Sequence, residues 1–190
     1  KQEAPSEQVA SCLPKWLYKK LEAGYQNDFI ELLANMQLKA PIWLRVNTRK
    51  ISHAHYVEAL QEAGIEFSHS SGHPAALILS KGHDITNLPG FESGWFAVQD
   101  GAAQLAAYYL KPEQGETILD CCAAPGGKTC HIIEFQPDIA KIIALEIDNR
   151  RAAKIEEKLV RLGHNASIVV GDASTPEKWS GEEFYDRVLL

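Results

Sequence analysis

The chain has 190 residues, 45% of them hydrophobic, which is enough for one well-formed core or for one domain with a small companion. No run approaches the roughly 20 apolar residues of a membrane span, and the polar first ten residues hold no secretory signal, so a cytoplasmic protein with no membrane partner is expected. The net charge of −6 argues against a general nucleic-acid coat, because phosphate neutralisation favours a basic surface.

The first part of the chain predicts a linker, residues 1–12, followed by a small α+β module, residues 13–111. Turn residues, capping residues and apolar periodicity divide the module into short elements. In chain order these are helices over 14–24 and 29–38, a strand over 42–47, a helix that is capped by Ser52 and ends at Gly64, strands over 76–80 and 95–99, and a mostly apolar helix over 100–110.

From residue 112 the pattern changes to an alternation of strands and helices. Strands are expected over 117–120, 141–146, 166–170 and 185–190, with helices over 127–135 and 149–162. Such alternation predicts a parallel sheet with right-handed crossovers. The expected fold class is therefore α/β, with a Rossmann-like sheet over residues 112–190 that the small α+β module precedes.

Polar residues and glycines gather where the predicted parallel strands end. The loop DCCAAPGGKT, residues 120–129, follows the first strand, Glu146 ends the second, and Asp172 follows the third. Ligands of open α/β sheets bind outside the carboxyl ends of the strands. Three acidic strand ends around one glycine loop therefore predict a ligand site.

Several common kinds of site fit this loop poorly. Its GGKT segment copies the end of a phosphate-binding P-loop, but Cys122 stands where the leading glycine belongs, and the dinucleotide fingerprint GxGxxG is missing. The spacing of Cys121, Cys122 and Cys130 does not suit zinc, so no metal site is expected. Cys122 as a nucleophile remains an alternative, although a small buried cysteine lining the turn is the favoured interpretation.

The remaining interpretation is a nucleoside cofactor without phosphates. Glu146 lies 19 residues after Gly127, close to the spacing of roughly 20 for a carboxylate that accepts hydrogen bonds from ribose. The Pro125-Gly126-Gly127 backbone can approach an amino-acid tail, and Lys128 offers a cation to a carboxylate. S-adenosylmethionine has both a ribose and an aminocarboxylate.

A local cluster of cations interrupts the acidic composition. The stretch from residue 39 to 57 carries Lys39, Arg45, Arg49 and Lys50 but no Asp or Glu. Two interpretations stay open for these cations, namely a strand edge with solvated side chains and an RNA-facing patch.

The loop residues Asp120 to Thr129 resemble the D-x-C-A-A-P-G-G-K-T cofactor loop of the RsmB (Fmu, Sun-type) ribosomal-RNA cytosine methyltransferases at all ten positions. The segment from Pro41 to Asn47 is similar to the P-x-W-x-R-[VI]-N strand of that family, and ALEIDNRR and VVGDAS are similar to its second and third strand motifs. The resemblance covers about residues 13–190.

The resemblance implies an enzyme that uses S-adenosylmethionine to form 5-methylcytosine in ribosomal RNA, with the small-subunit RNA as the expected substrate. It implies that the α+β module faces RNA, with Arg45 and Asn47 among its contacts. It also implies a cofactor site in which Glu146 binds the ribose, in place of the aspartate of many relatives, Asp172 contacts the adenine, and the loop supplies Cys122, Ala123, Ala124, Pro125, Gly126, Gly127 and Lys128.

The same resemblance places the catalytic residues elsewhere. In this family a cysteine thiolate adds to carbon 6 of cytosine before carbon 5 takes the methyl group. The nucleophile lies in a T-C-S motif and a second cysteine in D-A-P-C-S, and neither motif occurs in this sequence. We therefore expect the nucleophile beyond Leu190, and a fragment that holds the cofactor half and transfers no methyl group.

Three other functions are weighed against this one. The substrate could be transfer RNA or another RNA, or the chain could be a non-catalytic RNA-binding module with the same fold. A nucleotide-dependent oxidoreductase is disfavoured because GxGxxG is missing. The sequence makes no prediction of the oligomeric state.

Overall fold

A computed structural model describes residues 12–80, 82–181 and 183–190. The chain divides into two compact units, residues 1–40 and 41–190. The predicted linker, residues 1–12, falls outside the described residues except for Cys12.

The first unit contains a pair of short helices. Its elements are α2 (Lys15–Tyr25), η1 (Gln26–Asp28) and α3 (Phe29–Met36). Tyr18 and Phe29 meet edge to face, with 4.9 Å between their ring centroids. The predicted helices are present, although Gly24 lies inside α2 rather than at its end and the second helix ends two residues earlier than expected.

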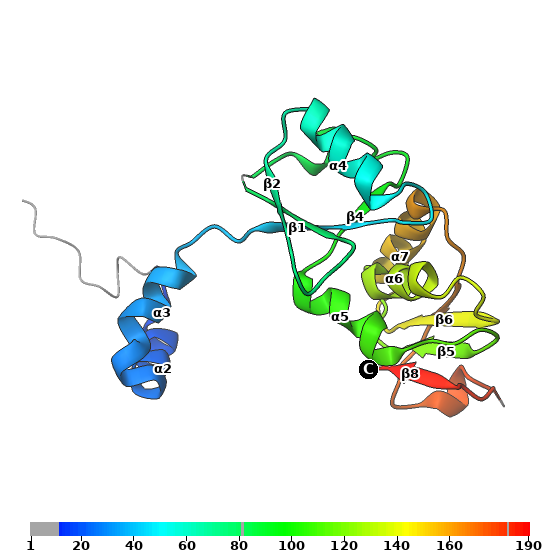
Figure 1. Ribbon diagram of the computed structural model, residues 1–190. Helices are drawn as coiled ribbons and strands as arrows, with labels where there is room; N and C mark the ends of the chain where they lie inside the picture. Colours follow the sequence, from blue (N-terminus) through cyan, green and yellow to red (C-terminus); the bar gives the residue numbers. More distant parts are fainter. Residues whose placement is uncertain (1–11, 81, 182) are drawn as a thin grey trace, which may run out of the picture. The chain divides into compact units, whose positions relative to one another are not determined.

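The second unit begins with an antiparallel sheet. Its strands are β1 (Ile42–Val46), β2 (Phe67–His69), β3 (Ala76–Leu79) and β4 (Phe96–Val98), in the order β2-β3-β1-β4, and its helical elements are α4 (His53–Glu62) and η2 (Ile85–Asn87) (Figure 1). The Ser52 side chain accepts a hydrogen bond from the His55 N–H and caps α4 as predicted. Strand β2 was not predicted.

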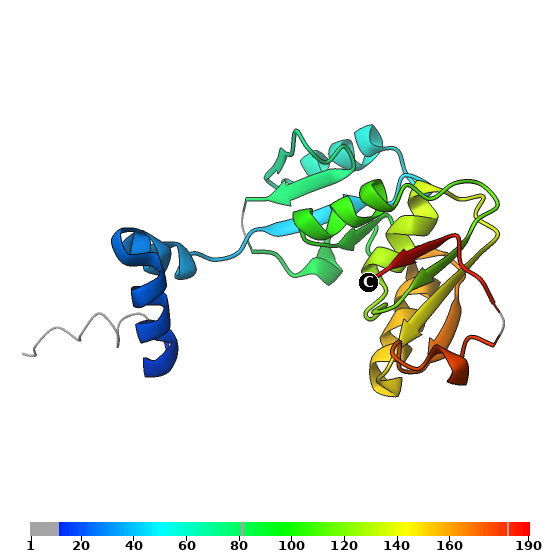
Figure 2. The same cartoon turned by 90° about the horizontal axis from the view of Figure 1, so that it is seen from below.

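A parallel sheet follows in the same unit. It is preceded by α5 (Gly101–Leu110) and formed by β5 (Thr117–Asp120), β6 (Lys141–Glu146), β7 (Ser167–Val170) and β8 (Arg187–Leu189), in the order β7-β6-β5-β8 (Figure 2). The remaining elements are α6 (Gly127–Phe135), α7 (Asn149–Leu162) and η3 (Pro176–Lys178). The predicted alternation and the parallel sheet are confirmed.

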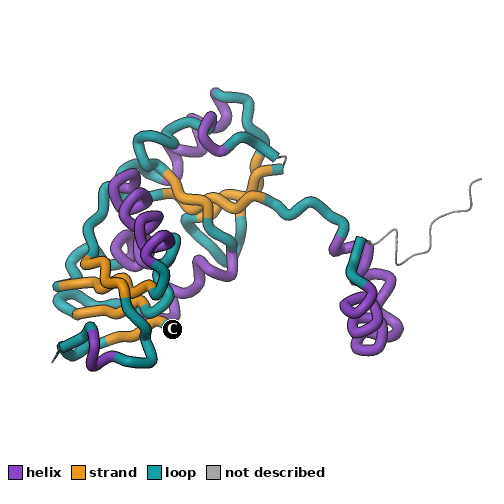
Figure 3. The backbone as a smooth tube through the Cα atoms, turned by 180° about the vertical axis from the view of Figure 1, so that it is seen from behind, coloured by secondary structure: helices purple, strands orange, loops and turns teal. Residues whose placement is uncertain are grey.

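Helices α6 and α7 cover the face of the parallel sheet that looks toward the antiparallel sheet (Figures 1 and 3). Ile132 of α6 and Ile155 and Leu159 of α7 pack there against Ile118 and Ile142 of the strands. The opposite face carries Leu119, Ile143 and Leu145, against which Trp179 and Tyr185 pack. The inner strands are buried on both sides, which explains their continuous apolar sequences.

The side chains of β1 alternate between two environments, as the pleat of a strand requires. Leu44 and Val46 pack against Tyr56 and Leu60 of α4 in a separate core. Arg45, between them, points to the other face of the sheet, where it meets α6. Within the described residues, no helix is long and apolar enough to cross a membrane.

Candidate cofactor site and domain junction

The ends of β5, β6 and β7 meet at one edge of the parallel sheet. Asp120 pairs with Ala144, and Glu146 pairs with Val170, so the strands end almost level. The Ala123 N–H donates to the Leu145 carbonyl at 3.0 Å, and the Gly171 N–H donates to the Glu146 carbonyl at 3.1 Å. The structure thus brings the glycine loop, Glu146 and the segment leading to Asp172 together.

The glycine loop turns sharply into α6. Gly126 has φ 89° and precedes the helix, and a Cβ at this position would lie 3.3 Å from the Ile155 Cα. A side chain there would meet both an unfavourable backbone conformation and a packed neighbour. Cys122, Pro125 and Lys128 are exposed around the turn. The loop therefore presents its backbone and the amino end of α6, where helical N–H groups lack partners within the helix.

Asp120 stabilises the start of this loop and does not line the candidate site. Only 1% of the residue is exposed, and its carboxylate accepts a hydrogen bond from the Thr129 hydroxyl at 2.7 Å. Burial raises the pKa of Asp120, while the hydrogen bonds from Thr129 and from the backbone of Cys122 oppose that shift. Asp120 holds the two ends of the loop together and is not positioned as a ligand.

Glu146 is the buried carboxylate at the centre of the site, with 2% of the residue exposed. Its Oε2 accepts from the Ala124 N–H at 3.3 Å. Its Oε1 accepts from the Asp148 N–H at 3.1 Å and from Arg151 Nη1 at 3.2 Å. A carboxylate offers about four acceptor positions, so these three bonds leave capacity for a further donor.

Arg151 is exposed on α7 and also contacts the candidate site. Its Nη1 pairs with Glu146, and its Nη2 donates to the Ala124 carbonyl at 3.3 Å, so the side chain bridges the loop and the carboxylate. The sequence contained a sign that Arg151 has a partner, because the helix dipole disfavours a cation in the first turn of a helix.

Asp172 lies at the rim of the site and is exposed. Its Oδ1 accepts from the Ser174 N–H and hydroxyl, both at 2.8 Å, and these bonds lower the pKa of Asp172. Its carbonyl accepts from the Trp179 indole N–H at 2.7 Å. The position of Asp172 is therefore fixed by its own turn.

The four cysteines are free thiols in different environments. Cys130 is fully buried, and burial raises the pKa of its thiol to about 12. Burial and the neighbouring Asp120 raise the pKa of Cys121. Cys122 is exposed, so its interpretation as a small buried cysteine was wrong; the buried thiol belongs to Cys130.

The residues at this edge fit S-adenosylmethionine. A buried carboxylate with remaining acceptor capacity, which a ribose requires, lies beside a loop in which Gly126 is buried, Gly127 is half-buried, and Cys122 and Pro125 are exposed. Lys128 is exposed at the first turn of α6 and can meet a carboxylate.

Comparisons with known proteins agree with this geometry. A family model described as 16S rRNA methyltransferase RsmB/F matches residues 107–190. A second, described as the ferredoxin-like domain of RsmF/B-like methyltransferases, matches residues 13–86. The chain belongs to the RsmB/F methyltransferase family.

Individual relatives extend the match over most of the chain. Ribosomal RNA small subunit methyltransferase B of Vibrio cholerae is 44% identical over 177 residues, which is 93% of this chain and 41% of that protein. The protein of the same name from Klebsiella pneumoniae is 43% identical over 178 residues, again 93% of this chain and 41% of that protein. The crystal structure of PH0851 has a TM-score of 0.88 and 29% identity, covering 100% of this chain and 44% of that one. This RsmB/F chain thus spans about two fifths of the length of these relatives.

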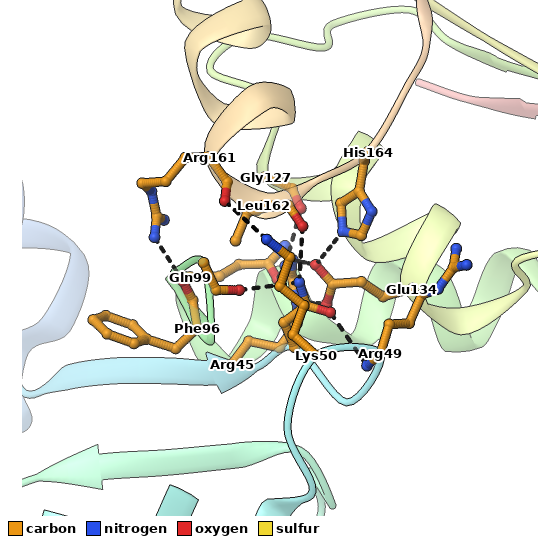
Figure 4. A network of polar contacts seen from close by, with 12 residues as sticks. Arg45, Arg49, Lys50, Phe96, Gln99, Gly127, Glu134, Arg161, Leu162 and His164 are labelled. Atoms are coloured by element: carbon orange, nitrogen blue, oxygen red, sulfur yellow. Dashed lines mark hydrogen bonds and ion pairs between the residues drawn. The ribbon is translucent and has the colours of Figure 1, made fainter. Parts of the chain in front are cut away.

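The ferredoxin-like part of this RsmB/F chain meets the methyltransferase part through a buried polar network (Figure 4). Arg45 Nε and Nη2 donate to the two carboxylate oxygens of Glu134 at 2.9 and 2.8 Å. Arg45 Nη1 donates to the Gly127 carbonyl at 3.0 Å. Nearby, Asn47 Nδ2 donates to the carbonyls of Gly94 and Leu162, each at 3.1 Å.

This network corrects the expectation that Arg45 and Asn47 contact RNA. Both residues are 0% exposed and hydrogen-bonded inside the unit, so neither side chain reaches a surface. Alternation along β1 explains the error, because Arg45 lies on the strand face that packs on α6. Lys39, Arg49 and Lys50 are the cations of this stretch that are exposed.

Proposed function

We propose that this chain provides the cofactor-binding part of an S-adenosylmethionine-dependent methyltransferase that forms 5-methylcytosine in small-subunit ribosomal RNA. Membership of the RsmB/F family and the names of the relatives support the reaction and the substrate. The observation that carries the cofactor assignment is the buried carboxylate of Glu146, which lies against the backbone of the glycine loop. The protein would act in the cytoplasm, with ribosomal RNA as its partner and without a membrane partner.

In this proposal each part of the site has its own task. S-adenosylmethionine supplies an electrophilic methyl group when it is bound. Glu146 accepts hydrogen bonds from the ribose, Asp172 lies near the adenine, and Lys128 attracts the aminocarboxylate. The backbone of the loop from Cys122 to Gly127 shapes the space for the amino-acid tail.

Methyl transfer to cytosine requires a cysteine thiolate as nucleophile. Cys130 is poorly suited to this role. Cys130 is buried, and its raised pKa keeps it protonated at neutral pH. We expect the nucleophile in the T-C-S motif of the family, which, like the D-A-P-C-S motif of the second cysteine, does not occur in this sequence. Residues 112–190 would form the cofactor half of the methyltransferase domain, and residues 13–111 the module that approaches RNA.

The cofactor assignment predicts a loss of affinity in Glu146→Ala. Losing hydrogen bonds to a charged acceptor costs about 1.5 to 3 kcal/mol, or roughly 10- to 150-fold in the dissociation constant. Isothermal calorimetry with S-adenosylmethionine on the full-length protein measures this change. Glu157→Ala, which removes an exposed carboxylate of α7, is the control. An unchanged dissociation constant in Glu146→Ala would remove Glu146 from the site.

The reaction itself is tested by radiolabelled methyl transfer to unmodified small-subunit ribosomal RNA. The full-length protein should methylate a cytosine at carbon 5, and residues 1–190 alone should transfer nothing. Turnover by residues 1–190 would show that the nucleophile lies within this sequence.

A further inference from the structure

One buried guanidinium connects the ferredoxin-like part of the chain to the cofactor loop. Arg45 extends from β1 and bonds to both carboxylate oxygens of Glu134, near the far end of α6. It also bonds to the Gly127 carbonyl and to Gln99 Oε1 (Figure 4). Gly127 is at once the last glycine of the loop and the first residue of α6.

Helix geometry allows one side chain to bond at both places. Gly127 and Glu134 lie about two turns apart on α6. The Gly127 carbonyl points along the helix toward its carboxyl end, whereas side chains such as that of Glu134 lean toward the amino end. The three nitrogens of the planar arginine fork can then donate to both carboxylate oxygens and to this carbonyl, an arrangement that the single nitrogen of a lysine cannot reproduce.

The partners of Arg45 are themselves held in place. Gln99 donates its backbone N–H to the Trp43 carbonyl at 3.1 Å, and its carbonyl accepts from Gln104 Nε2 at 2.9 Å. Glu134 also bonds to His164 Nε2 at 3.1 Å. Arg45 therefore joins β1 to the last residue of the loop through partners that have further bonds of their own, and no exposed side chain takes part.

We propose that Arg45 is a positioning residue for the cofactor site, in that it fixes Gly127 and so raises the affinity of the loop for S-adenosylmethionine without touching the ligand. This inference rests on the proposed function for the identity of the ligand. It assigns to the ferredoxin-like part a second role besides any contact with RNA.

Two variants separate this role from simple loss of stability. Arg45→Lys keeps a positive charge beside Glu134, but its single nitrogen cannot reproduce the two bonds to the carboxylate together with the bond to Gly127. The double variant Arg45→Met/Glu134→Gln removes the ion pair without leaving a buried charge unpaired, so it is the second route if the lysine variant folds poorly. Asn47→Ala is the matched control, because it breaks bonds of the same junction to Gly94 and Leu162 and none to α6.

The first measurement is backbone amide exchange over residues 122–130 of the full-length protein without ligand, together with the melting temperature. Both Arg45 variants should exchange faster in this segment than the unaltered protein. Asn47→Ala should lower the melting temperature while leaving exchange in the segment unchanged. Equal exchange in the Arg45 variants and Asn47→Ala would overturn the positioning role.

The second measurement is the calorimetric dissociation constant for S-adenosylmethionine. The Arg45 variants should bind about fivefold or more weakly, and Asn47→Ala should bind as the unaltered protein does. Unchanged binding by the Arg45 variants would also overturn the role. If the unaltered full-length protein fails to bind, the proposed function is wrong, and the amide exchange still decides whether Arg45 positions the loop.

Discussion

Burial and neighbouring charges together set the charge states of His131 and Glu134 on α6. His131 is 5% exposed, and burial together with the neighbouring Arg45 guanidinium lowers its pKa to about 3. Burial alone would raise the pKa of Glu134, but Arg45 and His164 outweigh it and lower this pKa below its ordinary value. The helix thus holds a neutral imidazole beside an ionised carboxylate at neutral pH.

This arrangement predicts that the protein loses stability as the pH falls below neutral. His131 has an ordinary pKa of 6.5 when unfolded and about 3 when folded, so the unfolded chain binds an extra proton between these values. The free energy of unfolding should therefore fall with decreasing pH, by up to about 1.4 kcal/mol per unit from this residue. Urea unfolding between about pH 7 and pH 5 should show a flatter dependence in His131→Leu.

The control for this prediction is His55→Gln, which removes an exposed histidine of α4. Its pH dependence should match that of the unaltered protein. An equally steep dependence in His131→Leu would mean that other groups are responsible for the acid sensitivity.

Among the elements, α7 has the clearest sequence signature. Asp148 caps its amino end by accepting from the N–H groups of Arg150 at 2.8 Å and of Arg151 at 3.4 Å. Gly163 ends the helix with φ 75°. Asp148 also donates its backbone N–H to Glu146 Oε1 at 3.1 Å, so the cap residue supports the position of Glu146 as well as the helix.

Removing this cap should destabilise the protein without abolishing the fold. Asp148→Ala leaves two helical N–H groups without their side-chain acceptor, and losing such a cap costs about 1 kcal/mol. Urea unfolding at neutral pH measures the change. Glu157→Ala, at an exposed position in the middle of α7, should change stability by less than half as much, and equal losses would show that the Asp148 bonds contribute nothing.

The sequence predicted the elements whose signals are local. The amphipathic pattern of α7 and the apolar runs of β5 and β6 were sufficient, because burial against a sheet imposes these patterns. Strand β2 was missed because it has three residues with only one apolar side chain, Phe67. Its strand conformation comes from pairing with β3 rather than from its own propensity.

The sequence located the candidate site only through the residues at the ends of the predicted strands. Glycine-loop spacing located Glu146, but the partners of Arg45 could not be predicted, since Glu134 lies 89 residues away in the sequence. An arginine in an apolar strand has the same local pattern whether its other side meets solvent or a buried carboxylate. Only the packing of β1 against α6 distinguishes the two.

At the scale of the whole molecule, the antiparallel and parallel sheets of residues 41–190 behave as one compact unit. Besides the Arg45 network, Arg161 of α7 donates to the carbonyls of Phe91 and Phe96 at 2.8 and 3.1 Å and lies 4.4 Å from the Phe91 ring centroid. Gly94 brings the backbone before β4 against α7. The junction therefore combines buried polar bonds with direct backbone contact and leaves little room for a side chain.

Gly94→Ala tests whether this junction holds the two sheets together. Gly94 has φ +67°, and a Cβ there would lie 2.1 Å from the Arg161 carbonyl oxygen, so the backbone must move and the nearby Asn47 bonds must break. Gly64 has the same φ of +67° with no atom within 4 Å of an added Cβ, so Gly64→Ala carries only the cost of a left-handed alanine, about 1 to 2 kcal/mol. Gly94→Ala should lose about 2 kcal/mol more than this control in urea unfolding, because it also breaks buried contacts. Amide exchange should rise on both sides of the junction in Gly94→Ala alone, whereas similar losses in the two variants would mean that the sheets do not depend on this contact.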